Sequence, residues 1–197
     1  MDADPVELRV LGCLIEKQRT TPDQYPLSLN ALRLACNQST NRDPVVDYDE
    51  ATIRAALERL SRREWVRLAS GPGSRAAKYR HLFDEALGLD GAEISLLAVL
   101  MLRGPRTAGE LKARTERLHA FASLPELDQT LSRLSERELV VRQPRRPGQK
   151  EERWAQLLGG EQEEAAAPPA APPDSLEARV ERLEADLAAL RRELGLA

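Results

Sequence analysis

The sequence predicts a mainly α-helical protein with small β-hairpins: two tandem winged-helix domains, then a flexible linker and a C-terminal coiled-coil helix. The main observation is a repeat. The segment LERLSRREWV at 57–66 returns 74 residues later as LSRLSERELV at 131–140, with seven of ten positions identical. Each copy ends an apolar-periodic helix and leads into two short β-rich segments joined by a Gly/Pro turn. This is the element order of a winged helix, and it occurs twice.

The first domain is assigned to residues 1–85, the second to 86–158. Periodicity and turn residues predict three helices and two strands in the first, at about 5–18, 27–36, 48–63, 65–69 and 77–82. The same signals predict the same order in the second, at about 91–102, 108–118, 124–137, 139–142 and 150–156. Residues 83–89 are expected to bridge the domains. The repeat spacing favours two small hydrophobic cores over one large one.

Helix starts are marked by an Asp, Ser or Thr followed three residues later by Glu, the pattern of a capping box. Six such pairs each precede an apolar run, namely Asp4/Glu7, Asp47/Glu50, Asp90/Glu93, Thr107/Glu110, Ser123/Glu126 and Asp174/Glu177.

Residues 159–173 (GGEQEEAAAPPAAPP) are predicted to be a linker, because this composition cannot bury enough apolar area to offset the conformational entropy lost when the chain becomes ordered. Residues 174–197 carry a heptad pattern that predicts a coiled-coil helix with six oligomerisation positions: Leu176, Val180, Leu183, Leu187, Leu190 and Leu194. Opposite charges at facing flanking positions favour a self-associating parallel coil. A helix folded back on its own body, or a trimer, is the alternative.

Composition and residue inventory restrict the class of protein. With 42% hydrophobic and 31% charged residues, no apolar run of roughly 20 and an acidic N-terminus, the chain is expected to be cytoplasmic, without a membrane segment or signal peptide. Cys13 and Cys36 are expected to be buried, reduced thiols. We expect no metal site and no cofactor, because these cysteines, His81 and His119 lack close ligand spacing.

Basic residues concentrate in the two hairpins. The net charge is −3, but the last 40 residues hold nine acidic and four basic side chains, so the body is +2 while its hairpins together are +7. Such charge suits neutralisation of DNA phosphates. The alternative is that basic side chains protect exposed strand edges. The candidate nucleic-acid-binding residues are Arg67, Arg75, Lys78, Arg80, Arg142, Arg145, Arg146 and Lys150.

Two further features bear on binding. The expected third helices, which enter the major groove in winged helices, begin with acidic residues such as Asp49, Glu50, Glu126 and Asp128, which do not favour contact with phosphate. A polar loop has side chains that could hydrogen-bond phosphate or a partner's backbone, although helix capping and turns are the alternative. Its residues are Asn37, Gln38, Ser39, Thr40, Asn41 and Arg42.

The segment TTPDQYPLSLNALRLACNQSTNRDPV at 20–45 resembles the YceH-like family of uncharacterised bacterial proteins. The resemblance extends to KYRHLF at 78–83, LRGPRTAGEL at 102–111 and the heptad tail, and so covers most of the chain. It implies tandem winged-helix domains and little about activity.

The motifs indicate a binding protein and not an enzyme, because the sequence contains no nucleophile beside a base and no Gly-rich phosphate loop after a strand. The first hypothesis is a homo-oligomeric, regulator-like protein that binds double-stranded DNA through basic wings. The alternative is a docking or scaffold module for a protein partner, without DNA binding.

Overall fold

The computed structural model describes residues 2–70, 77–145 and 148–159. The predicted linker beyond Gly159 and the whole predicted coiled-coil helix, 174–197, with its Asp174/Glu177 capping pair and its positions Leu176 to Leu194, lie outside the described residues, as do Arg75 and Arg146. The predictions for these segments are therefore not tested.

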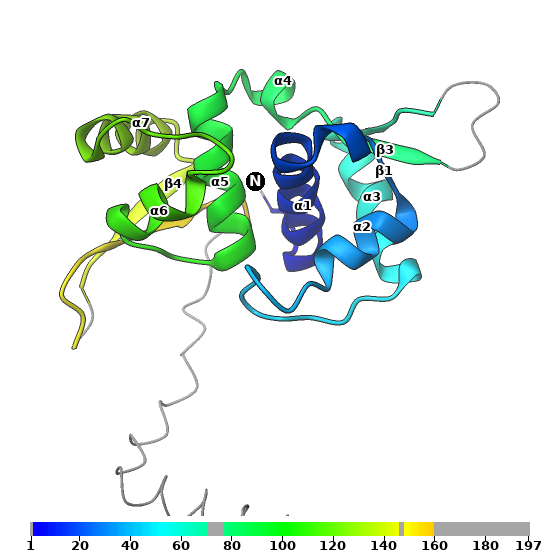
Figure 1. The fold of residues 1–197 in the computed structure, drawn as a ribbon, viewed down its shortest axis with the longest axis horizontal. Helices are drawn as coiled ribbons and strands as arrows, with labels where there is room; N and C mark the ends of the chain where they lie inside the picture. The colour runs from blue at the N-terminus through cyan, green and yellow to red at the C-terminus, as the bar shows by residue number, and fades with distance from the viewer. Residues whose placement is uncertain (1, 71–76, 146–147, 160–197) are drawn as a thin grey trace, which may run out of the picture. The chain divides into compact units, whose positions relative to one another are not determined.

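In its described residues, the first half of the chain contains three α-helices, a short 3-10 helix and a three-stranded antiparallel sheet (Figure 1). Its elements are α1 (Pro5–Thr20), the 3-10 helix η1 (Pro22–Gln24), β1 (Leu27–Ser28), α2 (Leu29–Cys36), α3 (Glu50–Arg62), β2 (Val66–Leu68) and β3 (Lys78–His81). The sheet order is β1-β3-β2. β1 was not predicted. The expected second helix begins two residues later than 27, because Ser28 caps it by accepting a hydrogen bond from the Ala31 amide at 3.3 Å.

The second half follows the same order after a short helix that the sequence did not predict, α4 (Phe83–Leu87). Its other elements are α5 (Gly91–Arg103), α6 (Ala108–Thr115), α7 (Leu124–Glu136), β4 (Val140–Gln143) and β5 (Arg153–Gln156). β4 and β5 pair antiparallel, and an isolated bridge joins Arg106 to Trp154 just before α6. This bridge has the same place in the second half as β1, just before α2, has in the first. The described chain is thus mainly helical with small antiparallel sheets, consistent with a winged-helix-like architecture.

Local capping explains most helix starts. Full capping boxes begin α1, α5 and α6, as predicted for Asp4/Glu7, Asp90/Glu93 and Thr107/Glu110. Ser123 caps α7, although the Glu126 carboxylate accepts from the Ala122 amide and not from the cap residue. The prediction for α3 was wrong: Asp49, and not Asp47, caps it, by accepting from the Thr52 amide at 2.7 Å.

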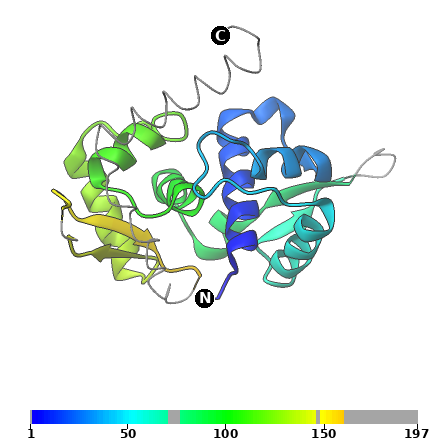
Figure 2. The same cartoon turned by 90° about the horizontal axis from the view of Figure 1, so that it is seen from below.

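α1 and α5 pack against each other at the centre of residues 2–159 (Figures 1 and 2). Gly12 permits this packing, because a Cβ there would lie 2.9 Å from Cγ of Leu102 on α5. The buried apolar side chains of both halves form one continuous cluster. The expectation of two separate cores is therefore wrong, since the first helix of each half shares its apolar surface with the other. The predicted boundary at residue 85 falls within α4 and stays a prediction.

α5 is the most apolar helix described, with every residue from Glu93 to Leu102 buried. No helix among the described residues is long and apolar enough to cross a membrane.

Candidate nucleic-acid interface

The first hairpin carries three described candidate cations. Arg67 on β2 pairs with Arg80 on β3 in the antiparallel register, and Lys78 begins β3. Arg67 and Lys78 are exposed, and no acidic partner lies beside their side chains in the described chain. Arg80 differs, because its Nη2 lies 2.6 Å from Oε1 of Glu85 on α4. Two of these three cations are therefore available to an external anion.

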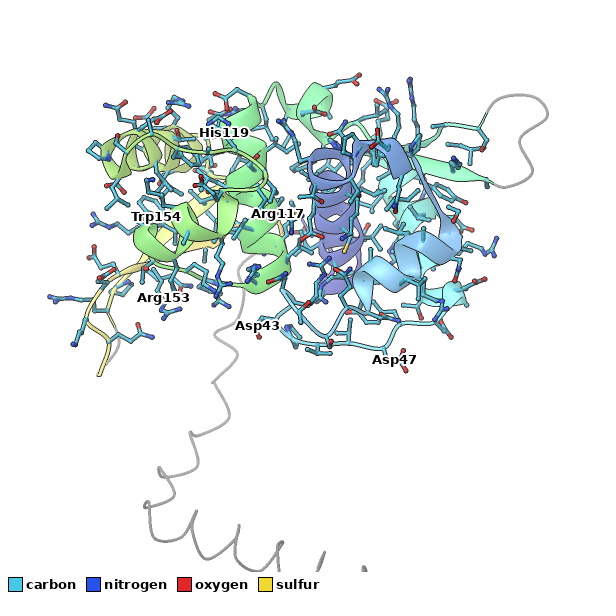
Figure 3. The ribbon with its side chains drawn as sticks, viewed as in Figure 1. Asp43, Asp47, Arg117, His119, Arg153 and Trp154 are labelled. Atoms are coloured by element: carbon cyan, nitrogen blue, oxygen red, sulfur yellow. The ribbon has the colours of Figure 1, made fainter. Side chains whose placement is uncertain are left out.

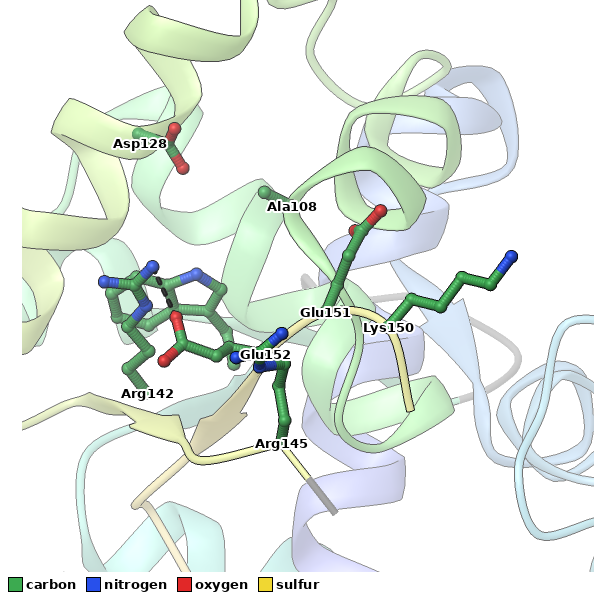
Figure 4. A pocket seen from close by; sticks show the side chains of 8 residues that line it. Ala108, Asp128, Arg142, Arg145, Lys150, Glu151 and Glu152 are labelled. Carbon is green, nitrogen blue, oxygen red and sulfur yellow. Dashed lines mark ion pairs between the residues drawn. The ribbon is translucent and has the colours of Figure 1, made fainter. Parts of the chain in front are cut away.

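The second hairpin brings its described cations together around a pocket of about 400 Å³ (Figure 4). Arg142 already has partners within the protein: its Nη2 lies 2.5 Å from Oε2 of Glu152, and its guanidinium carbon is 5.9 Å from the Trp154 ring centroid. Arg145 and Lys150 are exposed, without an ion pair to a described residue. The same pocket also contains carboxylates, from Asp128, Glu151 and Glu152.

Arg153 on β5, labelled in Figure 3, is also engaged in contacts within the protein. Its Nη1 donates to the Pro105 carbonyl at 3.0 Å and lies 3.6 Å from Oε2 of Glu110, so it holds the hairpin to the start of α6. The hairpin charge counted from sequence therefore overstates the charge open to a ligand.

The arginines shared by the two repeat copies face inward, toward the helix starts. Arg59 and Arg63 on the α3 side lie near the Asp4/Glu7 box, and Arg133 and Arg137 near the Asp90/Glu93 box. The exposed side of the first two turns of α7 instead carries Glu126, Asp128 and Gln129. Neither third helix therefore offers a uniformly basic surface to a DNA groove.

The polar loop is largely occupied by contacts within the protein. The Asn37 amide group donates to the Tyr48 carbonyl at 2.8 Å, and its oxygen accepts from the Tyr48 amide at 2.9 Å. Arg42 is buried, and it donates to both carboxylate oxygens of Glu16, at 3.1 and 2.6 Å, and to the Ala35 carbonyl. Ser39, Thr40 and Asn41 stay exposed. Through Asn37 and Arg42 the loop is thus tied to α1, to α2 and to the segment before α3, and its binding role stays a prediction.

Both cysteines are buried and free, as predicted. The hydrogen bond to Cys13, together with burial, raises the pKa of Cys36. In the described part of the chain, no group of three or more His, Cys, Asp or Glu residues is placed to hold a metal ion.

A third group of cations was missed by sequence reasoning. Lys17 on α1, Arg103 on α5 and Arg114 and Arg117 in or after α6 line one cavity of about 200 Å³. The three-residue spacing of Arg114 and Arg117 was the only local signal, because it places both on one side of a helical turn. The contributions of α1 and α5 depend on how the two halves pack.

The family described as "Protein of unknown function, DUF480" matches residues 3–149. The chain belongs to this family. DUF480 relatives include UPF0502 proteins of three bacteria. That of Opitutus terrae is 50% identical over 189 residues, which cover 94% of this chain and 82% of the relative. The protein of Geotalea daltonii is 50% identical over 177 residues, which cover 89% of this chain and 80% of the relative. The protein of Dechloromonas aromatica is 48% identical over 196 residues, which cover 94% of this chain and 91% of the relative. The expected bacterial family is thus confirmed as DUF480, while the label YceH-like is not.

Proposed function

We propose that this DUF480 chain binds double-stranded DNA through the phosphate backbone, using the hairpins of two tandem winged-helix domains. The observation that carries the proposal is that four hairpin cations, Arg67, Lys78, Arg145 and Lys150, are exposed and have no ion pair with any described residue. Other cations nearby, such as Arg80 and Arg142, already have carboxylate partners. Unpaired cations on projecting hairpins can neutralise phosphates without the cost of breaking an internal ion pair.

The element order supports the domain assignment within this proposal. The repeated helix, helix, helix and hairpin, with a short bridge to the hairpin before each second helix, is the arrangement of a winged helix. In that fold the hairpin lies along the phosphates. The acidic start of α7 disfavours base readout by that helix, so the expected binding is salt-dependent and weakly selective. Winged-helix folds also serve other roles, so the fold alone does not decide the function.

Fluorescence anisotropy with a labelled, mixed-sequence duplex tests the proposal, with salt raised from about 50 to 200 mM. Binding should weaken steeply with salt. The double variant Arg145→Ala/Lys150→Ala should lower the slope of log K against log salt by up to about 2, since each lost phosphate contact contributes about 0.9. Arg62→Ala is the matched control, because Arg62 is exposed and unpaired among the described residues but lies outside both hairpins.

A protein-docking role is the second candidate. It is favoured by the start of α7, where the exposed Leu124 lies beside acidic side chains, a mixture that suits a protein partner better than phosphate. Absence of duplex binding by the intact chain at low salt would exclude the DNA proposal and leave this one.

A further inference from the structure

A cavity of about 200 Å³ lies where the ends of α1 and α5 meet α6 and the polar loop. We call it the interhelical cavity. Its polar lining comes from all four elements and includes Lys17, Gln38, Thr40, Arg103, Arg114 and Arg117. None of these cations belongs to a hairpin, so the cavity is separate from the surface proposed to contact DNA.

The single carboxylate in the lining, that of Glu16, is already fully engaged. Both of its oxygens accept hydrogen bonds from Arg42, and Lys17 Nζ lies 3.3 Å from Oε2. Burial raises the pKa of Glu16, but the hydrogen bond and charge of Arg42 outweigh it and lower the pKa below its ordinary value. Glu16 is therefore ionised, and Arg42, which is buried behind it, matches its one negative charge.

The remaining cations lack compensation. Arg114 and Arg117 are exposed, and no described acidic residue forms an ion pair with either. Arg103 donates to the Asn41 amide oxygen, a neutral partner. Partial burial, with the charge of Arg114 next in effect, lowers the pKa of Arg103. Several positive charges thus repel one another across a small concave space, and an anion there would relieve the repulsion.

Neutral hydrogen-bond donors complete the lining. The Gln38 side-chain oxygen accepts from Arg42 at 2.8 Å, which leaves its NH₂ group for a ligand. Thr40 is exposed, and its hydroxyl forms no hydrogen bond with a described residue. Guanidinium forks combined with amide and hydroxyl donors match the tetrahedral oxygens of a phosphate.

We propose that the interhelical cavity binds a small phosphorylated anion, of the size of a phosphate monoester or pyrophosphate. The volume of the cavity limits the size of the ligand, because it lies below the roughly 300–1,000 Å³ of pockets that hold drug-sized ligands. The charge sets the class, since the uncompensated cations of Arg103, Arg114 and Arg117 require more than one negative charge on a compact ligand. Because the lining joins both halves of the chain, such a ligand would also stabilise their packing.

Isothermal titration of the full-length chain with sodium pyrophosphate, at constant ionic strength, tests the inference. Wild type should bind one equivalent saturably, and Arg114→Ala and Arg117→Ala should each weaken binding at least tenfold. Neither arginine forms an ion pair or a side-chain hydrogen bond with a described residue, so neither change removes one. Lys112→Ala is the matched control, because Lys112 is a cation on α6 that does not line the cavity, and it should stay within twofold of wild type.

Lack of saturable pyrophosphate binding by the wild type would overturn the inference, as would equal effects of Arg114→Ala and Lys112→Ala. A competition arm separates the two sources of phosphate. If duplex DNA displaces pyrophosphate, and the Arg114 and Arg117 variants weaken both ligands equally, the cavity binds DNA phosphates and the inference fails. If the chain binds duplex but not pyrophosphate, the inference fails while the proposed function stands.

Discussion

Arg59 and Arg133 occupy the same position of the internal repeat and make the same contact, each with the N-cap aspartate that begins the first helix of its half. Arg59 Nη2 lies 2.5 Å from Oδ2 of Asp4, and Arg133 Nη2 lies 3.2 Å from Oδ2 of Asp90. Each arginine also approaches the buried Glu of the same capping box, Glu7 or Glu93. The identity of the repeat at these arginines therefore has a structural cause, the joining of a third helix to a first helix.

Arg59→Ala should lower the free energy of unfolding by about 1 kcal/mol. The expected loss exceeds that of an ordinary surface pair, because the buried carboxylate of Glu7 loses a nearby cation. Urea unfolding measures the change. The control is Arg62→Ala on the same helix, which should stay within about 0.5 kcal/mol of wild type, as exposed substitutions usually do. Equal losses in the two variants would contradict the assigned role.

Gly12→Ala should destabilise the chain by about 1–3 kcal/mol, because its Cβ would press on Leu102 where α1 meets α5. The gain in helix propensity, about 1 kcal/mol, opposes this cost only in part. Gly109→Ala is the matched control, since a Cβ there has only the Thr107 hydroxyl, at 4.0 Å, near it. That variant should be stabilised by up to about 1 kcal/mol. Differential scanning calorimetry of both would detect opposite shifts in Tm; a rise for both would argue against tight α1/α5 packing.

Glu138→Gly should raise the free energy of unfolding by about 0.5–1 kcal/mol. Glu138 lies just after the C-cap of α7 with φ of +55°, as Glu64 lies just after the C-cap of α3 with φ of +62°, and L side chains rarely adopt this backbone region. Glu136→Gly, two residues earlier and still within the helix, should lower it by up to about 1 kcal/mol. Chemical denaturation gives both values. The same sign for the two changes would refute the explanation.

Stability should fall as pH drops from about 6.5 to about 4. Burial, opposed by Asp84 and assisted by Arg19 and Arg80, lowers the pKa of His81 to about 4 from its ordinary 6.5. Between these pH values the unfolded chain binds a proton that the folded chain does not, so the free energy of unfolding falls by up to roughly 3 kcal/mol. Nε2 lies 2.6 Å from Oε1 of Gln18, and Nδ1 lies 3.4 Å from Oδ1 of Asp84.

His81→Gln should remove this part of the pH dependence, since glutamine can still donate to Gln18 and does not titrate. Urea midpoints at several pH values between 4 and 7 measure it. If the variant keeps the full wild-type slope, the acid sensitivity arises elsewhere.

The predicted coiled coil should make the full-length chain an oligomer in solution. Leu183→Asp/Leu187→Asp places charge at core heptad positions and should reduce the molar mass measured by light scattering to that of one chain. Ala185→Asp, at the outward position between them, should leave the mass unchanged. A wild-type mass of a single chain would rule out self-association.

Much of the secondary structure was predictable, because the signals that start and end helices act within one or two turns. The capping pairs, the apolar periods and the Gly/Pro turns located the six predicted helices and the strands of both hairpins to within a few residues. β1 was not predicted, because a segment of two residues is too short to show the alternating hydrophobic pattern of a strand and becomes a strand only by pairing with β3. The same applies to the bridge between Arg106 and Trp154.

The sequence by itself determined the repeated element order and the presence of cations on the hairpins, because both depend on neighbours along the chain. Only the tertiary structure decided which cations remain unpaired. Arg142 is paired with Glu152, while Arg145 is not paired with any described residue. Tertiary structure also joined the two cores into one and placed Lys17, Arg103 and Arg114 around one cavity. The physical reason is that the packing of α1 against α5 brings together side chains that are far apart in the sequence. Their burial and their mutual electrostatic interaction cannot be read from any local sequence pattern.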